Sequence, residues 1–308
     1  MMLIFLSKRI FIGFLVVIFV SSLVFVITHI VTNPELAFLP IDATDAQRAS
    51  VRAYLGLDKG IFSQYLSFLG NLSRGNLGDS YWQPGKSAMS IVVERIPLTL
   101  KLDAFAIVLA LALAIPLGII SSLRPGTWLD RLTVSFSLIG LSAPQFWLGF
   151  ILVMFFGVRL GWFPTSGADE LKSFVLPGLA LALPTAGKIT QMVRSAMIDE
   201  FERPYMLTAR AKGIGLLDQI SRHSIRNISV TVLTQSSFEF VRMIAGFTLV
   251  VESVFAWPGI GRLTIQALEQ QDLMLLQAIV IVIATMIVIV NIVTDILYSL
   301  LDPRIKLS

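Results

Sequence analysis

Three charged residues, Glu239, Arg242 and Glu252, lie within or near the end of an apolar stretch of the sequence. Glu239 and Arg242 are three positions apart, so on a helix they share one face and can neutralise each other. Charged side chains inside a membrane face the interior of a helix bundle or an aqueous path. The pair therefore either lines a path or pins its helix to a neighbour, and the sequence leaves both interpretations open. Glu252 precedes a Trp-Pro-Gly at 257–259 that permits a sharp turn, and we interpret this segment as re-entrant or close to a gate.

The residues that most enzymes and metal sites need are scarce. The chain has no cysteine, and its two histidines, His29 and His223, are far apart. We therefore expect no thiolate chemistry, no metal site and no cofactor on this chain. A Gly-Lys-Ser at 85–87 lacks the preceding glycine of a phosphate-binding loop. We expect neither nucleotide binding nor catalysis by this polypeptide.

A polar and strongly basic loop covers residues 195–227. Pro204 suits the first position of a helix, residues 205–212 are mostly good helix formers, and Gly213 suits the position after the helix end. Lys212 falls in the last turn, where a cation is favoured. The pattern predicts a short exposed helix, which can pass a rigid-body movement into the membrane if spans brace it on both sides. An ordinary basic loop is the alternative.

The elements that must hold these residues are membrane spans. Of the 308 residues, 55% are hydrophobic and 14% are charged, and the mean hydropathy is +0.80. A soluble domain carries about 25% charged residues, and a helix of about 20 apolar residues crosses a bilayer. Pro144 predicts a kink in one span. The sequence predicts an all-α polytopic membrane protein with about six transmembrane helices, at 10–31, 98–121, 132–157, 174–192, 228–254 and 273–301.

These spans divide the chain into three parts. Residues 1–31 contain the first span, residues 32–97 form an extracytoplasmic insertion, and residues 98–308 form a five-span core that contains the loop 195–227. Basic residues of short loops collect on the cytoplasmic side of a membrane. Most of them, including those of 195–227, fall on one side if both termini are cytoplasmic, and we predict this orientation.

Six stretches, in the same order, resemble the permeases of ATP-binding-cassette importers, in the branch that carries dipeptides, oligopeptides and nickel. The resemblance covers nearly the whole chain, and it is most like the first of the two permeases usually found in such systems. Leu207 and Thr231 depart from the family's pattern. The stretches are Leu55-Gly56-Leu57-Asp58 with Gly75-Asn76-Leu77-Gly78, Gly140-Leu-Ser-Ala-Pro-Gln-Phe-Trp-Leu-Gly149, Leu160-Gly161-Trp162-x-Pro164, Tyr205-x-x-Thr208-Ala209-Arg210-Ala211-Lys212-Gly213 with Arg222-His223-x-x-Arg226-Asn227, Val251-Glu252-x-Val254-Phe255-x-Trp257-Pro258-Gly259-x-Gly261-Arg262, and Leu301-Asp302-Pro303-Arg304-Ile305.

The resemblance implies a type I importer permease fold in the bacterial inner membrane, in which the basic loop 195–227 is a coupling loop. Its short helix would dock into a groove on an ATPase subunit, with Ala209 packing closely and Arg210 and Lys212 reaching acidic groups at the rim. The residues that the resemblance assigns to ATPase coupling are Tyr205, Thr208, Ala209, Arg210, Ala211, Lys212 and Gly213. The candidates for lining the translocation path are Glu239, Arg242 and Glu252.

The function that the resemblance implies is translocation of peptides, or of a related small solute, driven by ATP hydrolysis on other chains. The implied partners are a second homologous permease, two ATPase subunits that bind ATP and Mg²⁺, an extracytoplasmic solute-binding protein and the bilayer, without nucleic acid. A nickel or metal-chelate importer is the alternative, because selectivity would reside largely in the binding protein. A secondary transporter would show inverted repeats and a charged mid-membrane ion site, and we find neither. A membrane-embedded enzyme would need clustered polar residues in its spans, and the Glu239 region alone comes near.

Overall fold

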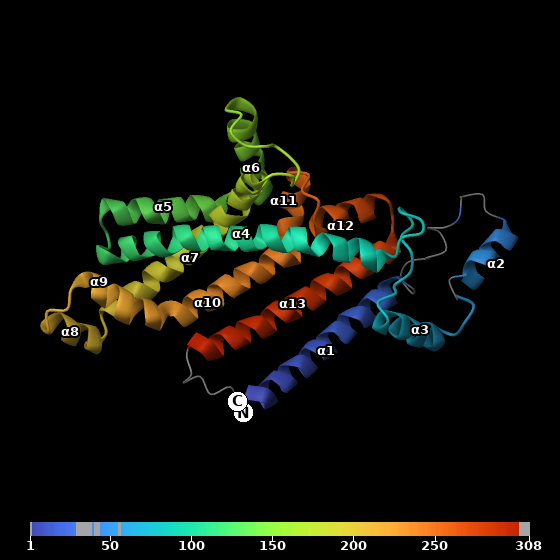
Figure 1. The fold of residues 1–308 in the computed structure, drawn as a ribbon, viewed down its shortest axis with the longest axis horizontal. Coiled ribbons are helices and arrows are strands. Elements are labelled where there is room, and N and C mark those ends of the chain that lie inside the picture. Colours follow the sequence, from blue (N-terminus) through green and yellow to red (C-terminus); the bar gives the residue numbers. More distant parts are fainter. Residues whose placement is uncertain (1, 29–38, 40–43, 55–56, 302–308) are drawn as a thin grey trace. The chain divides into compact units, whose positions relative to one another are not determined.

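The computed structural model describes residues 2–28, 39, 44–54 and 57–301. Within them, the regular secondary structure is helical, and one isolated antiparallel bridge joins Asp79 and Ser87. The family-like residues Leu55-Gly56 and Asp302-Pro303-Arg304-Ile305, His29 and the end of the first predicted span lie outside the described residues. The helices drawn in Figure 1 are α1 (Met2–Val26), α2 (Asp45–Tyr54), α3 (Ile61–Ser73), α4 (Ala88–Leu123), α5 (Trp128–Ser142), α6 (Gln145–Leu152), α7 (Val175–Phe201), α8 (Pro204–Ala211), α9 (Leu216–Asp218), α10 (Ile225–Arg242), α11 (Thr248–Val254), α12 (Ile260–Glu269) and α13 (Leu273–Leu301), with short π or 3₁₀ segments at Val153–Arg159, Leu171–Phe174, Gln219–Ser224 and Met243–Phe247.

Several of these helices are long and apolar enough to cross a membrane. In the described part of the chain, four continuous stretches meet this requirement: Phe5–Val26, Ala88–Leu123, Leu171–Phe201 and Leu273–Leu301. They correspond to the first, second, fourth and sixth predicted spans. The multi-span, all-helical architecture expected from the sequence is therefore present.

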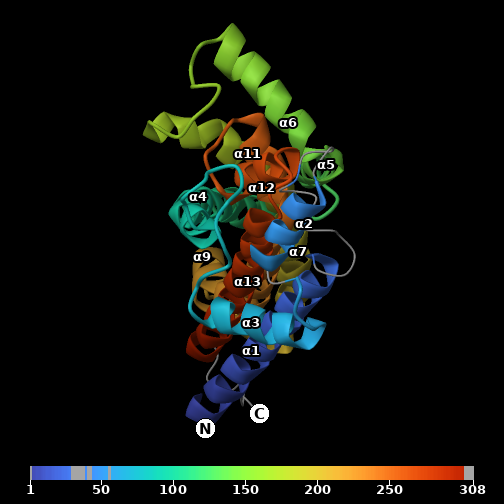
Figure 2. The same cartoon turned by 90° about the vertical axis from the view of Figure 1, so that its right-hand side faces the viewer.

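The third predicted span is broken. Trp128–Ser142 and Gln145–Arg159 are bent by 104° at a short break, and together they count as a fifth span if the pair is one broken crossing. Ala143 before Pro144 is extended, with φ −78° and ψ 126°, as a residue before proline prefers to be. Figure 2 shows α6 directed away from the axis of α5. The kink predicted at Pro144 is therefore present, and it is a sharp turn.

The fifth predicted span, 228–254, is helical but interrupted. It consists of α10, a π segment at Met243–Phe247 and α11, and the backbone leaves helical geometry at Gly246. This region is not among the helices of the described residues that meet the length and apolarity requirement. Its polar residues, Glu239 and Arg242 among them, account for the low apolarity.

The chain folds as two compact units. The first contains Met1–Met2, Leu98–Pro258 and Val290–Ser308, and the second contains Leu3–Pro97 and Gly259–Ile289. The second unit includes Gly259–Ile289, a segment that the sequence assigns to the core 98–308.

In the first unit, α7 is the central helix and packs against α5 and α10. Small residues let it approach its neighbours closely. A Cβ built on Gly187 would lie 2.6 Å from the carbonyl oxygen of Ser137 on α5, so only glycine permits this contact. Further along α7, the buried side chains Ile189, Val193 and Met197 form an apolar core with residues of α4 and α8. The first unit is therefore built around one helix that ends where the basic loop begins.

In the second unit, α3 is attached to α1, and residues 80–82 are attached to the start of α13. The Ser22 and Tyr65 hydroxyls lie 2.6 Å apart, and the Phe25 ring packs edge-on against Tyr65. The buried carboxylate of Asp272 accepts hydrogen bonds from the Ser80 hydroxyl at 2.5 Å and from the backbone N–H of Leu275 at 3.0 Å. Asp272 thus caps α13 and holds residues 80–82 against the start of this helix.

Candidate functional site

The basic loop forms the helix that its sequence predicts. Pro204 occupies the first helical position of α8, and the helix ends at Ala211. Gly213 has φ 74°, a left-handed conformation that other residues adopt at a cost. Its N–H donates to the Arg210 carbonyl at 3.0 Å, and the N–H of Ile214 donates to the Ala209 carbonyl at 3.1 Å. The glycine therefore closes the helix and reverses the chain toward α9.

A buried carboxylate, Glu200 at the end of α7, fixes the position of α8. Its side chain is 4% exposed. It accepts hydrogen bonds from the Tyr205 hydroxyl and from Asn227 Nδ2 at 2.6 Å, and it forms an ion pair with Arg203 Nε at 3.0 Å. Asn227 Nδ2 also donates to the Tyr205 oxygen at 2.8 Å. These four residues, which we call the Glu200 cluster, join α7, α8 and α10.

The Tyr205 hydroxyl remains a proton donor at physiological pH. Burial raises the pKa of Tyr205 above its ordinary value, and its hydrogen bond to the Glu200 carboxylate raises it further, against a smaller opposite effect of Asn227. A raised pKa favours the protonated phenol in the folded state. The contribution of the Tyr205 phenol to folding stability is therefore fully present below its ordinary pKa of about 10. It is lost only as the pH rises through the higher pKa of the folded state. The Tyr205 phenol therefore stays protonated through neutral pH.

The two sides of α8 have different environments. Met206 is fully buried and Ala209 is 5% exposed, and both belong to the apolar core of the first unit. Thr208, Ala211 and Lys212 are exposed on the helix or just after it. Ala209 therefore packs against its own chain, and its expected contact with an ATPase subunit stays a prediction. Sequence spacing alone does not say which face of a short helix turns inward.

Arg210 and Gln219 provide a second attachment of the loop. Gln219 is 5% exposed, donates from Nε2 to the Ile214 carbonyl at 2.6 Å and accepts from Arg210 Nε at 3.4 Å. The Arg210 guanidinium also lies 5.6 Å from the centre of the Phe201 ring. Arg210 is exposed but contacts its own chain, whereas Lys212 makes no ion pair with any described residue. Arg210 and Lys212 are the two basic residues expected to reach the rim of the ATPase groove. Of the two, Lys212 makes fewer contacts with its own chain.

A second cluster surrounds Glu239, whose side chain is 3% exposed. Lys188 Nζ on α7 lies 2.7 Å from Glu239 Oε1, and Arg242 NH1 lies 3.2 Å from both carboxylate oxygens. Gln235 Nε2 donates to Oε1 at 2.9 Å, and the Arg242 guanidinium covers the Phe247 ring. The expected contact between Glu239 and Arg242 is present, but its place on a translocation path stays a prediction. We call Lys188, Glu239 and Arg242 the Glu239 cluster.

Sequence reasoning did not identify Glu200, Lys188 or Gln235 as partners. A signal existed for Lys188, because a lysine inside an apolar span needs a counter-charge and Glu239 is a nearby candidate in another span. The Glu239 cluster has one negative and two positive charges, so its net charge is +1 by formal count.

Glu252 belongs to a different cluster. It is fully buried and accepts a hydrogen bond from the Thr99 hydroxyl at 2.7 Å. One turn further along α4, Asp103 accepts a hydrogen bond from Thr248 on α11. Two buried carboxylates thus join α4 to α11, and Glu252 has this role in packing. The structure does not bring it together with the Glu239 cluster, and its place on a translocation path also stays a prediction.

The chain resembles known membrane subunits along its length. The family model "Binding-protein-dependent transport system inner membrane component" matches residues 114–307, and the N-terminal model of the same kind of component matches residues 2–103. The oligopeptide transport system permease protein AppB of Bacillus subtilis is 34% identical over 89% of this chain and 90% of its own length. The glutathione transport system permease protein GsiC of Escherichia coli O6:H1 is 34% identical over 93% of this chain and 94% of its own length. A putative peptide transport system permease protein of Brucella abortus is 33% identical over 97% of this chain and 98% of its own length.

The fold also matches solved structures. An inward-facing form of the MetNI methionine ABC transporter aligns with a TM-score of 0.60 at 15% sequence identity, covering 70% of this chain and 97% of that chain. A second crystal form of the same transporter aligns with the same TM-score at 16% identity. At this identity the match concerns the fold, which is that of a type I importer permease.

Proposed function

The chain belongs to the binding-protein-dependent transport system inner membrane components, a family of ATP-binding-cassette importer permeases, and from this membership we propose that it forms the translocation path of a peptide importer and couples it to ATP hydrolysis. The observation that carries the proposal is the Glu200 cluster, in which one buried carboxylate holds α8 to α7 and α10. A helix held in this way moves as one body with the helices behind it, so a push on its exposed side is passed into the membrane.

The exposed residues Thr208, Ala211 and Lys212 of the loop are the surface that we assign to an ATPase subunit. In the proposed complex, a second homologous permease completes the path and an extracytoplasmic protein delivers the solute. Two ATPase subunits bind ATP and Mg²⁺. This chain contributes no catalytic residue and no cofactor of its own.

Short peptides are the solute that we propose. Relatives with high coverage are named for oligopeptide, glutathione and peptide transport. We expect proteoliposomes with the complete complex, the binding protein and ATP to accumulate radiolabelled Ala-Ala-Ala. A non-hydrolysable ATP analogue should stop the accumulation. Uptake that follows an ion gradient in the absence of ATP would contradict the proposal and favour a secondary transporter.

The proposed orientation places both termini and α8 in the cytoplasm and residues 32–97 outside. The chain has no cysteine, so single cysteines can be introduced without background. Gln47 on α2 is exposed, and Leu217 on α9 is 82% exposed. We expect an impermeant maleimide to label Gln47→Cys in intact cells and to label Leu217→Cys only after lysis. Labelling of Leu217→Cys alone in intact cells would reverse the orientation.

A further inference from the structure

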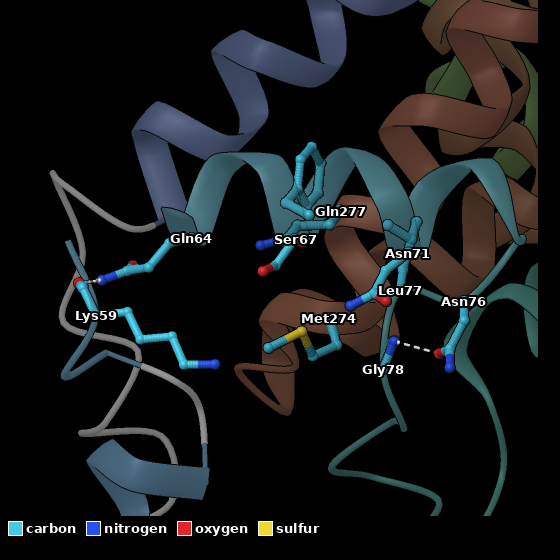
Figure 3. Close-up of a pocket in the computed structure, with 10 residues that line it drawn as sticks. Lys59, Gln64, Ser67, Asn71, Asn76, Leu77, Gly78, Met274 and Gln277 are labelled. Carbon is cyan, nitrogen blue, oxygen red and sulfur yellow. Dashed lines mark hydrogen bonds between the residues drawn. The ribbon is translucent and has the colours of Figure 1, made fainter. Parts of the chain in front are cut away.

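The second unit contains a small polar cavity of about 300 Å³ that the function proposed above does not use. Its walls come from α3, from the segment that follows α3 and from the first turns of α13. Figure 3 shows Lys59 extending from the far side of the hollow toward Met274, with Gln277 and Asn71 on the opposite wall. The volume is at the lower end of the range for small-molecule sites. We propose that this cavity binds the carboxyl-terminal end of a short peptide.

The charge of the lining favours an anion. Among the residues that the structure describes, Lys59 is the one cation of the lining, and no aspartate or glutamate takes part in it. Lys59 is exposed and makes no ion pair within the described residues. A carboxylate is the group that an ammonium and nearby amide N–H groups hold best, because charge-assisted hydrogen bonds are stronger than neutral ones.

The side-chain amides around Lys59 match a peptide group. Gln277 is 3% exposed, lines the cavity and makes no side-chain hydrogen bond with any described residue, so both its donor and its acceptor are available. The structure therefore places an amide with a free donor and a free acceptor at the wall of a cavity of ligand size.

Two further side-chain amides each offer one free hydrogen-bonding group. Gln64 Nε2 donates to the Lys59 carbonyl at 2.7 Å, which leaves its side-chain oxygen as an acceptor. Asn76 Oδ1 accepts the Gly78 N–H at 3.0 Å, which leaves its NH₂ group as a donor. A peptide group carries one N–H and one C=O, and this pair of amides complements both. Met274 gives the cavity an apolar wall, which suits the side chain of the last peptide residue.

The choice of a peptide as the ligand rests on the proposed function. The cavity itself is a separate site, on the segment that we place outside the membrane.

Peptide binding to this cavity is tested on the complete complex in lipid nanodiscs, without ATP and without the binding protein. The probe is radiolabelled Ala-Ala-Ala, compared by equilibrium dialysis with the same tripeptide as its carboxyl amide. We expect saturable binding of the free acid and binding of the amide that is about tenfold weaker.

Two variants locate the site. Gln277→Leu removes the buried amide at similar volume, and Lys59→Met removes the charge. Each should weaken binding of Ala-Ala-Ala by about tenfold. Gln266→Leu and Lys86→Met are matched controls on the same unit, because neither residue lines the cavity, and they should bind as the unmodified protein does.

The outcomes separate this site from the transport function. Equal binding of the acid and the amide, or equal binding by Gln277→Leu and its control, would overturn the site while ATP-driven uptake persists. The site would also be overturned if the unmodified complex bound no peptide and Lys59→Met lost docking of the binding protein. The cavity would then be a contact surface for that protein. Binding that depends on Gln277 in a complex without ATP-driven uptake would instead refute the transport proposal alone.

Discussion

Replacing Glu200 by alanine is expected to reduce solute-stimulated ATP hydrolysis by the reconstituted complex to its unstimulated rate. The carboxylate accepts hydrogen bonds from Tyr205 and Asn227 and pairs with Arg203, so its removal breaks the polar contacts that join α8 to α7 and α10. Because water can reach Arg203 and Asn227, we expect the fold to lose only about 2 kcal/mol. The loss of a fixed position for α8 should therefore affect coupling far more than stability. The measurement compares ATP hydrolysis with and without loaded binding protein.

Asp199 provides the matched control for this variant. It is the preceding residue, carries the same charge, is exposed and makes no hydrogen bond or ion pair with any described residue. Asp199→Ala should keep full stimulation. Glu200→Gln keeps an accepting oxygen without the charge, so we expect partial stimulation. If Glu200→Ala assembles with the ATPase subunits and is stimulated as strongly as Asp199→Ala, then the Glu200 cluster does not connect α8 to the spans.

Replacing Glu239 by glutamine is expected to reduce the yield and the thermal stability of the complex strongly. It leaves the cations of Lys188 and Arg242 close together without their shared carboxylate. Breaking a buried ion pair on one side costs about 3–5 kcal/mol. Both cations are partly exposed, with side chains 40% and 47% accessible, so we expect the lower end of that range. The measurement is the fraction of complex that elutes as one species, together with its melting temperature.

A second substitution tests whether the altered charge balance causes the loss of stability in Glu239→Gln. Glu239→Gln combined with Lys188→Gln restores the net charge of +1 and should recover much of the lost stability, as coupled residues do in a double-mutant cycle. An exchange of Glu239 and Arg242 should not restore it, because it places Arg beside Lys188. Glu269→Gln, at an exposed position of α12, is the control and should change stability by less than about 0.5 kcal/mol. A double variant as unstable as Glu239→Gln alone would show that the charges act separately.

The sequence is a good guide to elements that local chemistry determines. Apolar length locates the spans at α1, α4, α7 and α13, and Pro144 marks the break between α5 and α6. Pro204 and Gly213 bound α8 as predicted, since proline fixes φ and glycine accepts a positive φ. Each of these features depends on a few consecutive residues.

Features that depend on tertiary packing could not be predicted. Ala209 turns inward because α8 packs on the core around Met197, and no spacing rule gives that orientation. Asn227, which contacts Glu200, lies 27 positions away in the sequence, and Glu239, which contacts Lys188, lies 51 positions away. The fifth predicted span is interrupted at the π segment near Gly246, which hydropathy averaged over a window does not show. The position of Gln277 at the wall of a cavity likewise depends on the packing of α3 beside α13.

We propose that the exposed side of α8 receives movement from an ATPase subunit. Ala211 is on that side and contributes nothing to the buried core, so Ala211→Glu adds bulk and charge where the partner should dock while leaving the chain's own packing intact. Ala49→Glu makes the same change on the exposed surface of α2 and serves as the control. The decisive measurement is solute-stimulated ATP hydrolysis by the reconstituted complex of each variant. We predict full stimulation for Ala49→Glu and none for Ala211→Glu, and full stimulation of an assembled Ala211→Glu complex would contradict the assignment of α8 as the coupling helix.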